Sequence, residues 1–155
     1  MIVYCAGAIK GDTTYQNNYI EMIRFIESMS HTALAELNGK FKFSIPLSDN
    51  QIYTRDIKWI DGSLAMIAEI SGPSLGVGFE IAYAIFKKEI PVLALVSSDV
   101  EEISAMITGC NSELLTIKRY QNIEDMQNII SDYFKNLEQD SDEKGIHLPV
   151  HKEAR

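Results

Sequence analysis

Two acidic residues, Asp56 and Glu80, stand where their side chains could do chemistry. Glu80 interrupts the apolar stretch FEIAYAIF, and Asp56 follows Arg55 near the start of a short amphipathic segment. Two carboxylates in one cleft, of which one is ionised and the other holds a proton, can cleave a glycosidic bond. Each residue also has a simpler explanation, because an acid near a helix start is stabilised by the helix dipole and Asp56 could pair with Arg55.

The segment GPSLGVG, residues 72–78, leads to Glu80 and would let a ligand approach the backbone closely. Gly76 and Gly78 tolerate unusual dihedral angles, and the free N–H groups at the start of the next helix favour an anion. The pattern is not a dinucleotide-binding fingerprint, because Ile81 occupies the place of the third glycine. The chain also lacks a GxxxxGK[ST] motif, which excludes P-loop phosphoryl transfer.

The N-terminal segment MIVYCAGAIKG supplies two further candidates. Tyr4 comes near the end of an apolar run, where its hydroxyl group could orient a carboxylate or simply be satisfied in the core. Lys10 is the only cation of the turn that follows, and it could meet an anionic ligand or lie in solvent.

The composition describes one domain with an acidic surface. The chain has 155 residues, of which 46% are hydrophobic and 23% charged, and this excludes disorder or a fibrous repeat for the whole chain. Its formal net charge of -8 disfavours binding to a nucleic-acid polymer or an anionic membrane. Two cysteines make no disulfide framework, no Cys/His cluster indicates a metal, and the short apolar N-terminus lacks a basic leader. We therefore expect a cytoplasmic protein with free thiols.

Apolar segments rich in β-branched residues alternate with helical patterns. Strands are expected at residues 1–6, 42–45, 64–70, 91–96 and 114–118, and helices at residues 15–29, 54–60, 75–87, 100–108 and 123–137. This alternation is typical of an α/β domain with a parallel sheet covered on both faces. We expect one Rossmann-like (flavodoxin-like) doubly wound domain over residues 1–137, with about five strands in the order 2-1-3-4-5. Residues 138–155 are polar and are expected to form a mobile C-terminal tail.

The expected topology brings the candidate residues together. In open α/β sheets, ligands bind beyond the carboxyl ends of the strands where the strand order reverses, here between the first and third strands. The turn after the first strand and the loop at residues 72–78 end at this point, and Arg55, Asp56 and Ser104 follow neighbouring strands. The fold therefore predicts that Asp56 and Glu80 share one crevice.

Longer motifs around both acids are similar to a known family. The stretch RDIKWI, residues 55–60, and then LAMIAEISGPSLGVGFEIAYAI, residues 64–85, resemble the 2'-deoxynucleoside 5'-phosphate N-hydrolases, relatives of the nucleoside 2-deoxyribosyltransferases. The signature is an aspartate and tryptophan pair, an apolar strand, and then PSLGVG followed by an aromatic residue and glutamate. VYCAGAIKG, residues 3–11, and ISAMI, residues 103–107, resemble further family segments, and the similarity covers about residues 1–137.

The resemblance implies an enzyme that cleaves a deoxynucleoside 5'-monophosphate into the free base and 2-deoxyribose 5-phosphate. Glu80 would be the nucleophile that attacks the anomeric carbon, Asp56 would protonate or orient the leaving base, and Tyr4 would position Glu80. The implied substrate-binding residues are Gly7, Ala8, Ile9, Lys10, Ser74, Gly76, Gly78 and Ser104. The family is dimeric, so Ser104 would reach the site of the neighbouring subunit in a homodimer. The chemistry requires no metal and no organic cofactor.

The sequence leaves three functions open. The first is hydrolysis, the second is transfer of the deoxyribosyl group to another base, and the third is a nucleotide sensor without catalysis. The family's first turn carries serine, arginine and glycine where Ala8, Lys10 and Asp12 stand here. An unphosphorylated deoxynucleoside or a ribonucleotide therefore also stays open as the substrate.

Overall fold

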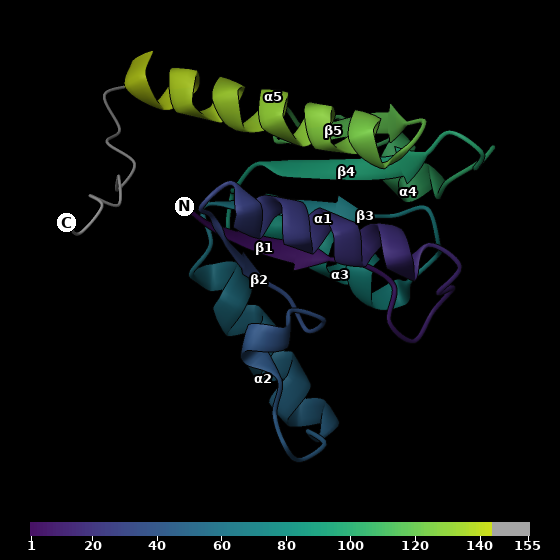
Figure 1. Ribbon diagram of the computed structural model, residues 1–155, viewed down its shortest axis with the longest axis vertical. Coiled ribbons are helices and arrows are strands. Elements are labelled where there is room, and N and C mark those ends of the chain that lie inside the picture. The colour runs from purple at the N-terminus through teal and green to yellow at the C-terminus, as the bar shows by residue number, and fades with distance from the viewer. Residues whose placement is uncertain (144–155) are drawn as a thin grey trace.

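The computed structural model describes residues 1–143, which form a doubly wound α/β fold (Figure 1). Its parallel strands lie in the order β2-β1-β3-β4-β5, which confirms the predicted fold class and strand order. The strands are β1 (Ile2–Ala6), β2 (Thr32–Leu34), β3 (Ala65–Glu69), β4 (Val92–Ser97) and β5 (Leu115–Tyr120). The order reverses between β1 and β3, as expected.

Helices cover both faces of this sheet. The helices are α1 (Gln16–Ser28), α2 (Asp49–Asp61), α3 (Leu75–Ala82), α4 (Ala105–Thr108) and α5 (Ile123–Glu143). α1 and α5 pack on one face, and α2 and α3 on the other (Figure 1). A 3-10 turn, η1 (Gly39–Phe41), precedes α2, and a π-helical turn, η2 (Tyr83–Lys87), continues α3.

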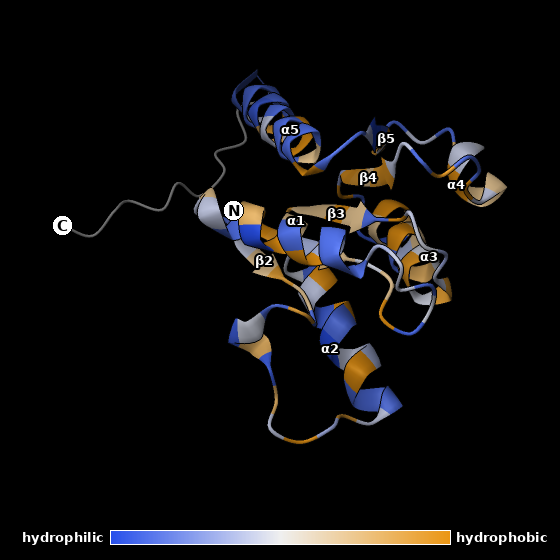
Figure 2. Cartoon of the chain, turned by 45° about the vertical axis from the view of Figure 1, so that its right-hand side comes forward, coloured by the Kyte–Doolittle hydropathy of each residue, from blue (hydrophilic) through white to orange (hydrophobic). Residues whose placement is uncertain are grey.

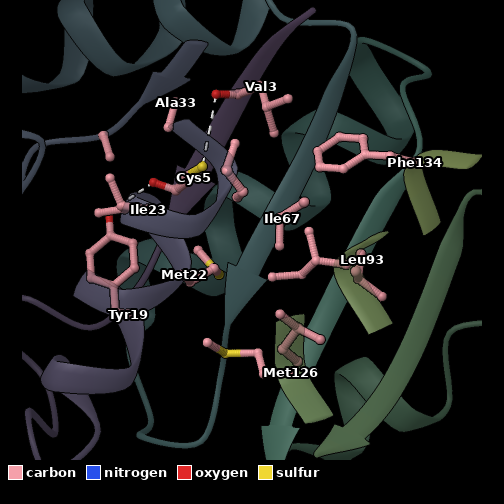
Figure 3. Packing of buried hydrophobic residues seen from close by; sticks show 14 of the residues in the cluster. Val3, Cys5, Tyr19, Met22, Ile23, Ala33, Ile67, Leu93, Met126 and Phe134 are labelled. Carbon is pink, nitrogen blue, oxygen red and sulfur yellow. Dashed lines mark hydrogen bonds between the residues drawn. The ribbon is translucent and has the colours of Figure 1, made fainter. Parts of the chain in front are cut away.

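Alternation along β1 decides which side chains reach which face. Val3 and Cys5 point to the α1 and α5 side, where they pack with Ile67 and a cluster of apolar side chains (Figure 3). Tyr4 and Ala6 point to the opposite side, toward α3. The hydropathy colours show the same layering, with apolar β3 and β4 inside and a largely polar α5 outside (Figure 2). β1 therefore delivers the Tyr4 side chain to the face that carries Glu80.

The prediction of a second strand at residues 42–45 is wrong, because β2 is Thr32–Leu34. Ala33 pairs with Val3 in the sheet and is fully buried. Phe43 and Ile45 instead lie in a loop, 59% and 73% exposed. Among the described residues, this segment has no neighbouring strand to pair with, so its apolar side chains do not form part of the sheet. A strand of three residues carries too little periodic pattern to be recognised.

Two helices differ from their expected bounds in ways that bear on the site. α2 begins at Asp49, where Ser48 and Gln51 form a capping box, so Asp56 lies in the middle of the helix and not near its start. Glu80 is the sixth residue of α3, beyond the first turn. At the C-terminus, α5 runs to Glu143, so the expected boundary at residue 137 falls inside a helix. Residues 144–155 of the expected tail lie outside the described residues.

Candidate active site

A cavity of about 580 Å³ opens where the strand order reverses. It is bounded by the turn after β1, the segment after β2, the start of α3, and one side of α2. Its lining contains Gly7, Ile9, Lys10, Gly11, Glu36, Asp49, Ile52, Tyr53, Asp56, Ile57, Ser74, Leu75, Gly76, Val77, Phe79 and Glu80. Asp56 and Glu80 therefore share one cavity, as the topology predicted.

One face of α2 forms the wall opposite α3. Its cavity residues follow helical spacing: Asp49, Ile52, Tyr53, Asp56 and Ile57. Residues three or four positions apart lie on the same side of a helix, so α2 presents a continuous strip to the cavity. The Tyr53 ring lies near the ring of Phe79 on α3, with centroids 6.2 Å apart. Between Asp49 and Asp56, the side of α2 that faces the cavity is therefore apolar and partly aromatic, and Phe79 on α3 extends this apolar surface.

Tyr4 and Glu80 are joined directly. The Tyr4 hydroxyl group donates a hydrogen bond of 3.0 Å to Oε1 of Glu80. Burial raises the pKa of Glu80 to about 7, the hydrogen bond from Tyr4 opposes this shift, and the negative charges of Asp56 and Glu36 add to it. Because Glu80 lies beyond the first turn of α3, burial and not the helix dipole is the largest influence on this pKa. Near neutral pH, Glu80 exists in both protonation states.

Asp56 lies in the cavity and also in an ion pair. Nε of Arg55 donates to Oδ1 of Asp56 at 2.8 Å, and Nη2 of Arg55 lies 3.3 Å from Oε2 of Glu36. The guanidinium group stacks over Trp59, 4.7 Å from its ring centroid. Burial raises the pKa of Asp56, while Arg55 opposes that shift. Burial favours the protonated form of Asp56 and the ion pair favours the ionised form, so Asp56 is placed to exchange a proton with a bound group.

The turn that follows β1 and the start of α3 form the other end of the cavity. Gly7 packs against the Tyr19 ring so closely that a Cβ atom would lie 2.4 Å from it. Lys10 is exposed at the rim. Ser74 caps α3, and its Oγ accepts a hydrogen bond of 3.3 Å from the Val77 N–H. A Cβ atom on Gly76 would meet only Ser74 Oγ, at 3.9 Å, so this backbone borders open space.

Three of the expected binding residues lie outside this lining. Ala8 is buried, between two residues that face the cavity. Gly78 and Ser104 instead line a second cavity of about 820 Å³ on the other side of α3, which Ser74 also borders. Ser104 caps the short helix α4 through a hydrogen bond of 3.3 Å from the Met106 N–H. Within one chain, these residues do not join Asp56 and Glu80.

Sequence reasoning missed Glu36 and the aromatic wall. Glu36 lies two residues beyond β2, at the same edge of the sheet as the first turn. With β2 placed correctly, the rule for carboxyl ends of strands would have found it. Tyr53 carried no signal until the true start of α2 was known, whereas Phe79 stood in the family motif without any sign that it would face Tyr53.

The described residues hold no group of three or more His, Cys, Asp or Glu side chains arranged for a metal ion. No helix within residues 1–143 is both long and apolar enough to cross a membrane.

A parallel doubly wound sheet with a carboxylate-lined cavity at the point where the strand order reverses defines a Rossmann-like protein with a candidate ligand site. No family model matches the chain. It is 33% identical over 135 residues to the Syntrophotalea carbinolica protein named "Putative 2'-deoxynucleoside 5'-phosphate N-hydrolase 1", covering 85% of this chain and 93% of that one. It is 31% identical over 147 residues to the 5-hydroxymethyl-dUMP N-hydrolase of Esox lucius, covering 90% and 100%.

A solved structure of a CMP N-glycosidase from Clostridium botulinum has the same fold, with a TM-score of 0.62 and 16% identity, over 84% of this chain and 98% of that one. The likeness in sequence to the two relatives is extensive enough to define the family. The chain belongs to the 2'-deoxynucleoside 5'-phosphate N-hydrolases, an enzyme family, which confirms the resemblance found in the motifs.

Proposed function

We propose that the protein hydrolyses the N-glycosidic bond of 2'-deoxynucleoside 5'-monophosphates to the free base and 2-deoxyribose 5-phosphate. The observation that carries this proposal is the cavity shared by Glu80 and Asp56, in which Tyr4 holds Glu80 by a hydrogen bond of 3.0 Å. The names of the relatives support the substrate class, since both describe hydrolases of deoxynucleoside 5'-phosphates.

The reaction proceeds in two displacements at the anomeric carbon. Ionised Glu80 attacks C1', the bond from C1' to the base nitrogen breaks, and the protonated Asp56 gives its proton to the leaving base. A deoxyribosyl ester of Glu80 results. Water then attacks C1' and gives a proton to Asp56, and Glu80 leaves as a carboxylate. Such a double displacement retains configuration and is typical of carboxyl groups about 5–5.5 Å apart.

The two ends of the cavity suit the two ends of a nucleotide. At one end, Lys10 and the N-terminus of α3 around Ser74 and Gly76 favour a 5'-phosphate. With the phosphate there and C1' at Glu80, the base extends toward α2 and Asp56. A ribose 2'-hydroxyl would withdraw electrons from the developing cation and crowd Glu80, so the deoxy sugar reacts faster.

A homodimer would complete this site. At the start of α3 and on α4, large apolar side chains stand in solvent, among them Leu75 at 97% and Met106 at 84% exposure. They surround the second cavity, which also contains Ser104. Pairing of two copies through this face buries the apolar side chains and brings Ser104 toward the phosphate end of the partner's site. The dimer and a cytoplasmic location both remain predictions.

The direct test is a panel of deoxy- and ribonucleosides, each with and without the 5'-phosphate, scored for released base. The proposal predicts that the deoxynucleoside 5'-monophosphates react fastest and that Glu80→Gln releases no base from any member. A best substrate without phosphate, or with ribose, would contradict the proposed substrate class.

Two further measurements separate the alternative functions. With excess free adenine present, a transferase forms a new deoxyadenosine species, whereas the hydrolase releases the original base at an unchanged rate. A sensor without catalysis is stabilised against heat by nucleotides but releases no base. The hydrolase therefore differs from each alternative in a product that can be counted.

A further inference from the structure

Four carboxylates line the cavity, and the proposed reaction uses neither Glu36 nor Asp49. The Glu36 side chain keeps 38% exposure and lines the cavity beside Asp56 and Glu80. It lies two residues beyond Leu34, the last residue of β2, and therefore at the sheet edge where ligands bind. A carboxylate at this edge is placed to contact a ligand in the cavity.

Glu36 is paired with Arg55. Nη2 of Arg55 lies 3.3 Å from Oε2 of Glu36, while Nε of the same side chain is fixed by Asp56 at 2.8 Å. Its guanidinium group packs over Trp59, and the Arg55 side chain is only 12% exposed. Because Arg55 is anchored at two further points, its positive charge stays beside Glu36, although Nη2 and Oε2 are not aligned for a hydrogen bond. The Glu36 oxygens therefore remain open to a donor on a ligand. A polar group placed in this way can discriminate between ligands.

Glu36 lies at the end of the cavity that would receive the base. The phosphate end is formed by Lys10 and the start of α3, and C1' is placed at Glu80. The base must then lie between these and α2, against an apolar wall whose members are Ile52, Tyr53, Ile57 and Phe79. Such a wall contacts the faces of a flat ring and leaves its edge to polar groups.

We propose that Glu36 selects the base, and that it favours a base with an exocyclic amino group, the 4-amino group of cytosine or the 6-amino group of adenine. An ionised carboxylate only accepts hydrogen bonds. Cytosine and adenine present an amino donor at this edge, and glutamate accepting from the cytosine amino group is an established pairing, whereas thymine and uracil present the O4 acceptor. An acceptor opposite Glu36 would be repelled. This inference rests on the proposed function.

The test uses matched nucleotides that differ in the group that Glu36 would contact. The ratio of kcat/KM for dCMP over dUMP, and for dAMP over dIMP, is measured for the wild type and for Glu36→Gln. We expect the wild type to favour the amino member by about tenfold or more, the size expected for one hydrogen bond to a charged group. Glu36→Gln should bring both ratios to about one or below, because its amide can donate to an oxo group.

Both kcat/KM values of a ratio are measured with the same enzyme preparation. A lower fraction of folded protein in the variant lowers both values equally and cancels in their ratio. A wild-type preference for dUMP, or equal ratios in the wild type and Glu36→Gln, would overturn the inference. Asp49→Asn is the matched control, since Asp49 lines the same cavity but starts α2. We expect its ratios to stay within about twofold of the wild type. An equal shift in this control would assign the effect to cavity charge and refute a specific contact.

Failure of the proposed function would give a different result. In that case the wild type releases no base from any nucleotide of the panel. The selection by Glu36 is then measured as binding, from the thermal shift that dCMP and dUMP produce in the wild type and in Glu36→Gln. A greater shift with dCMP that disappears in the variant supports the inference, and equal shifts in the wild type contradict it.

Discussion

The hydroxyl group of Tyr4 lies 3.0 Å from Oε1 of Glu80, although the two residues are 76 positions apart in the chain. Burial and the nearby carboxylates raise the pKa of Tyr4, so its phenol stays protonated and acts as a donor throughout the pH range of most enzymes. A permanent donor favours the ionised form of the carboxyl group that it contacts. The pair therefore sets the fraction of Glu80 that is ready to attack.

The first prediction concerns the pH dependence of the Tyr4→Phe variant. With a pKa of about 7 for Glu80, kcat/KM of the wild type should fall as the pH drops below about 7. Tyr4→Phe removes a hydrogen bond that lowers this pKa, so the acid limb should move to higher pH. A pH profile of kcat/KM measures the shift. An acid limb at the same pH in both enzymes would contradict the proposed role of Tyr4.

The second prediction is that Glu80→Gln stabilises the fold at high pH while it abolishes turnover. Because the pKa of Glu80 is raised from 4.5 to about 7, the folded state holds a proton that the unfolded chain has lost between these values. Stability therefore falls as the pH rises through this window, by an amount on the order of 3 kcal/mol. Urea unfolding at pH 4 and at pH 8 measures the difference.

The glutamine variant lacks this pH-dependent loss, so its free energy of unfolding should exceed that of the wild type at pH 8 but not at pH 4. Its kcat should fall about a thousandfold or more, as expected for loss of a nucleophile. A stability difference that is equal at both pH values would mean that Glu80 ionises in the folded protein as it does in the unfolded chain.

The third prediction tests proton donation by Asp56. Asp56→Asn keeps the shape of the side chain but cannot hold a transferable proton. Bases that leave poorly without protonation should be slowed most, whereas good leaving groups should react at rates closer to the wild type. The measurement is kcat for a series of deoxynucleotides ordered by the acidity of the released base. Equal slowing across the series would leave Asp56 a role in orientation only.

The fold could be predicted from the sequence because its inner strands are strongly patterned. β3 and β4 are continuous apolar runs, and each is followed by a helical pattern, which determines a parallel sheet. β2 could not be found in this way. Only three residues pair, Ala33 alone is fully buried, and what makes the segment a strand is its long-range pairing with β1.

The candidate site was predictable to the same extent. Asp56 and Glu80 were recognised because their motifs are local, and the predicted topology placed both at one sheet edge. Glu36 depends on the position of β2, so it was lost with that strand. The raised pKa of Glu80 could not be read from the sequence either, since it results mainly from burial by segments far apart in the chain.

The fourth prediction concerns a site shared between two subunits. If Ser104 completes the partner's site, Glu80→Gln and Ser104→Ala should each lower activity alone. In a mixed dimer, one site combines Glu80 of the Ser104→Ala chain with Ser104 of the Glu80→Gln chain, so it is intact. Mixing the two variants should therefore restore about a quarter of wild-type activity, from one intact site in the half of the dimers that are mixed.

This recovery is measured after subunit exchange, with Glu80→Gln mixed with itself as the control. Activity that stays at the sum of the two separate variants would show that each site is built from one chain. Met106→Asp places a charge on the exposed apolar face and should convert the dimer to monomers, as measured by sedimentation.

The role of Glu80 as the nucleophile is tested most directly by mass spectrometry. The protein is quenched with acid during turnover of a deoxynucleoside 5'-monophosphate. If Glu80 is the nucleophile, a deoxyribosyl 5-phosphate group will be found attached to the peptide that contains Glu80. The attached group should be lost on longer incubation in water and should never form on Glu80→Gln. Two results together would show that Glu80 is not the nucleophile. The wild type and Glu80→Gln would release base at similar rates, and no sugar would be attached to that peptide in the wild type.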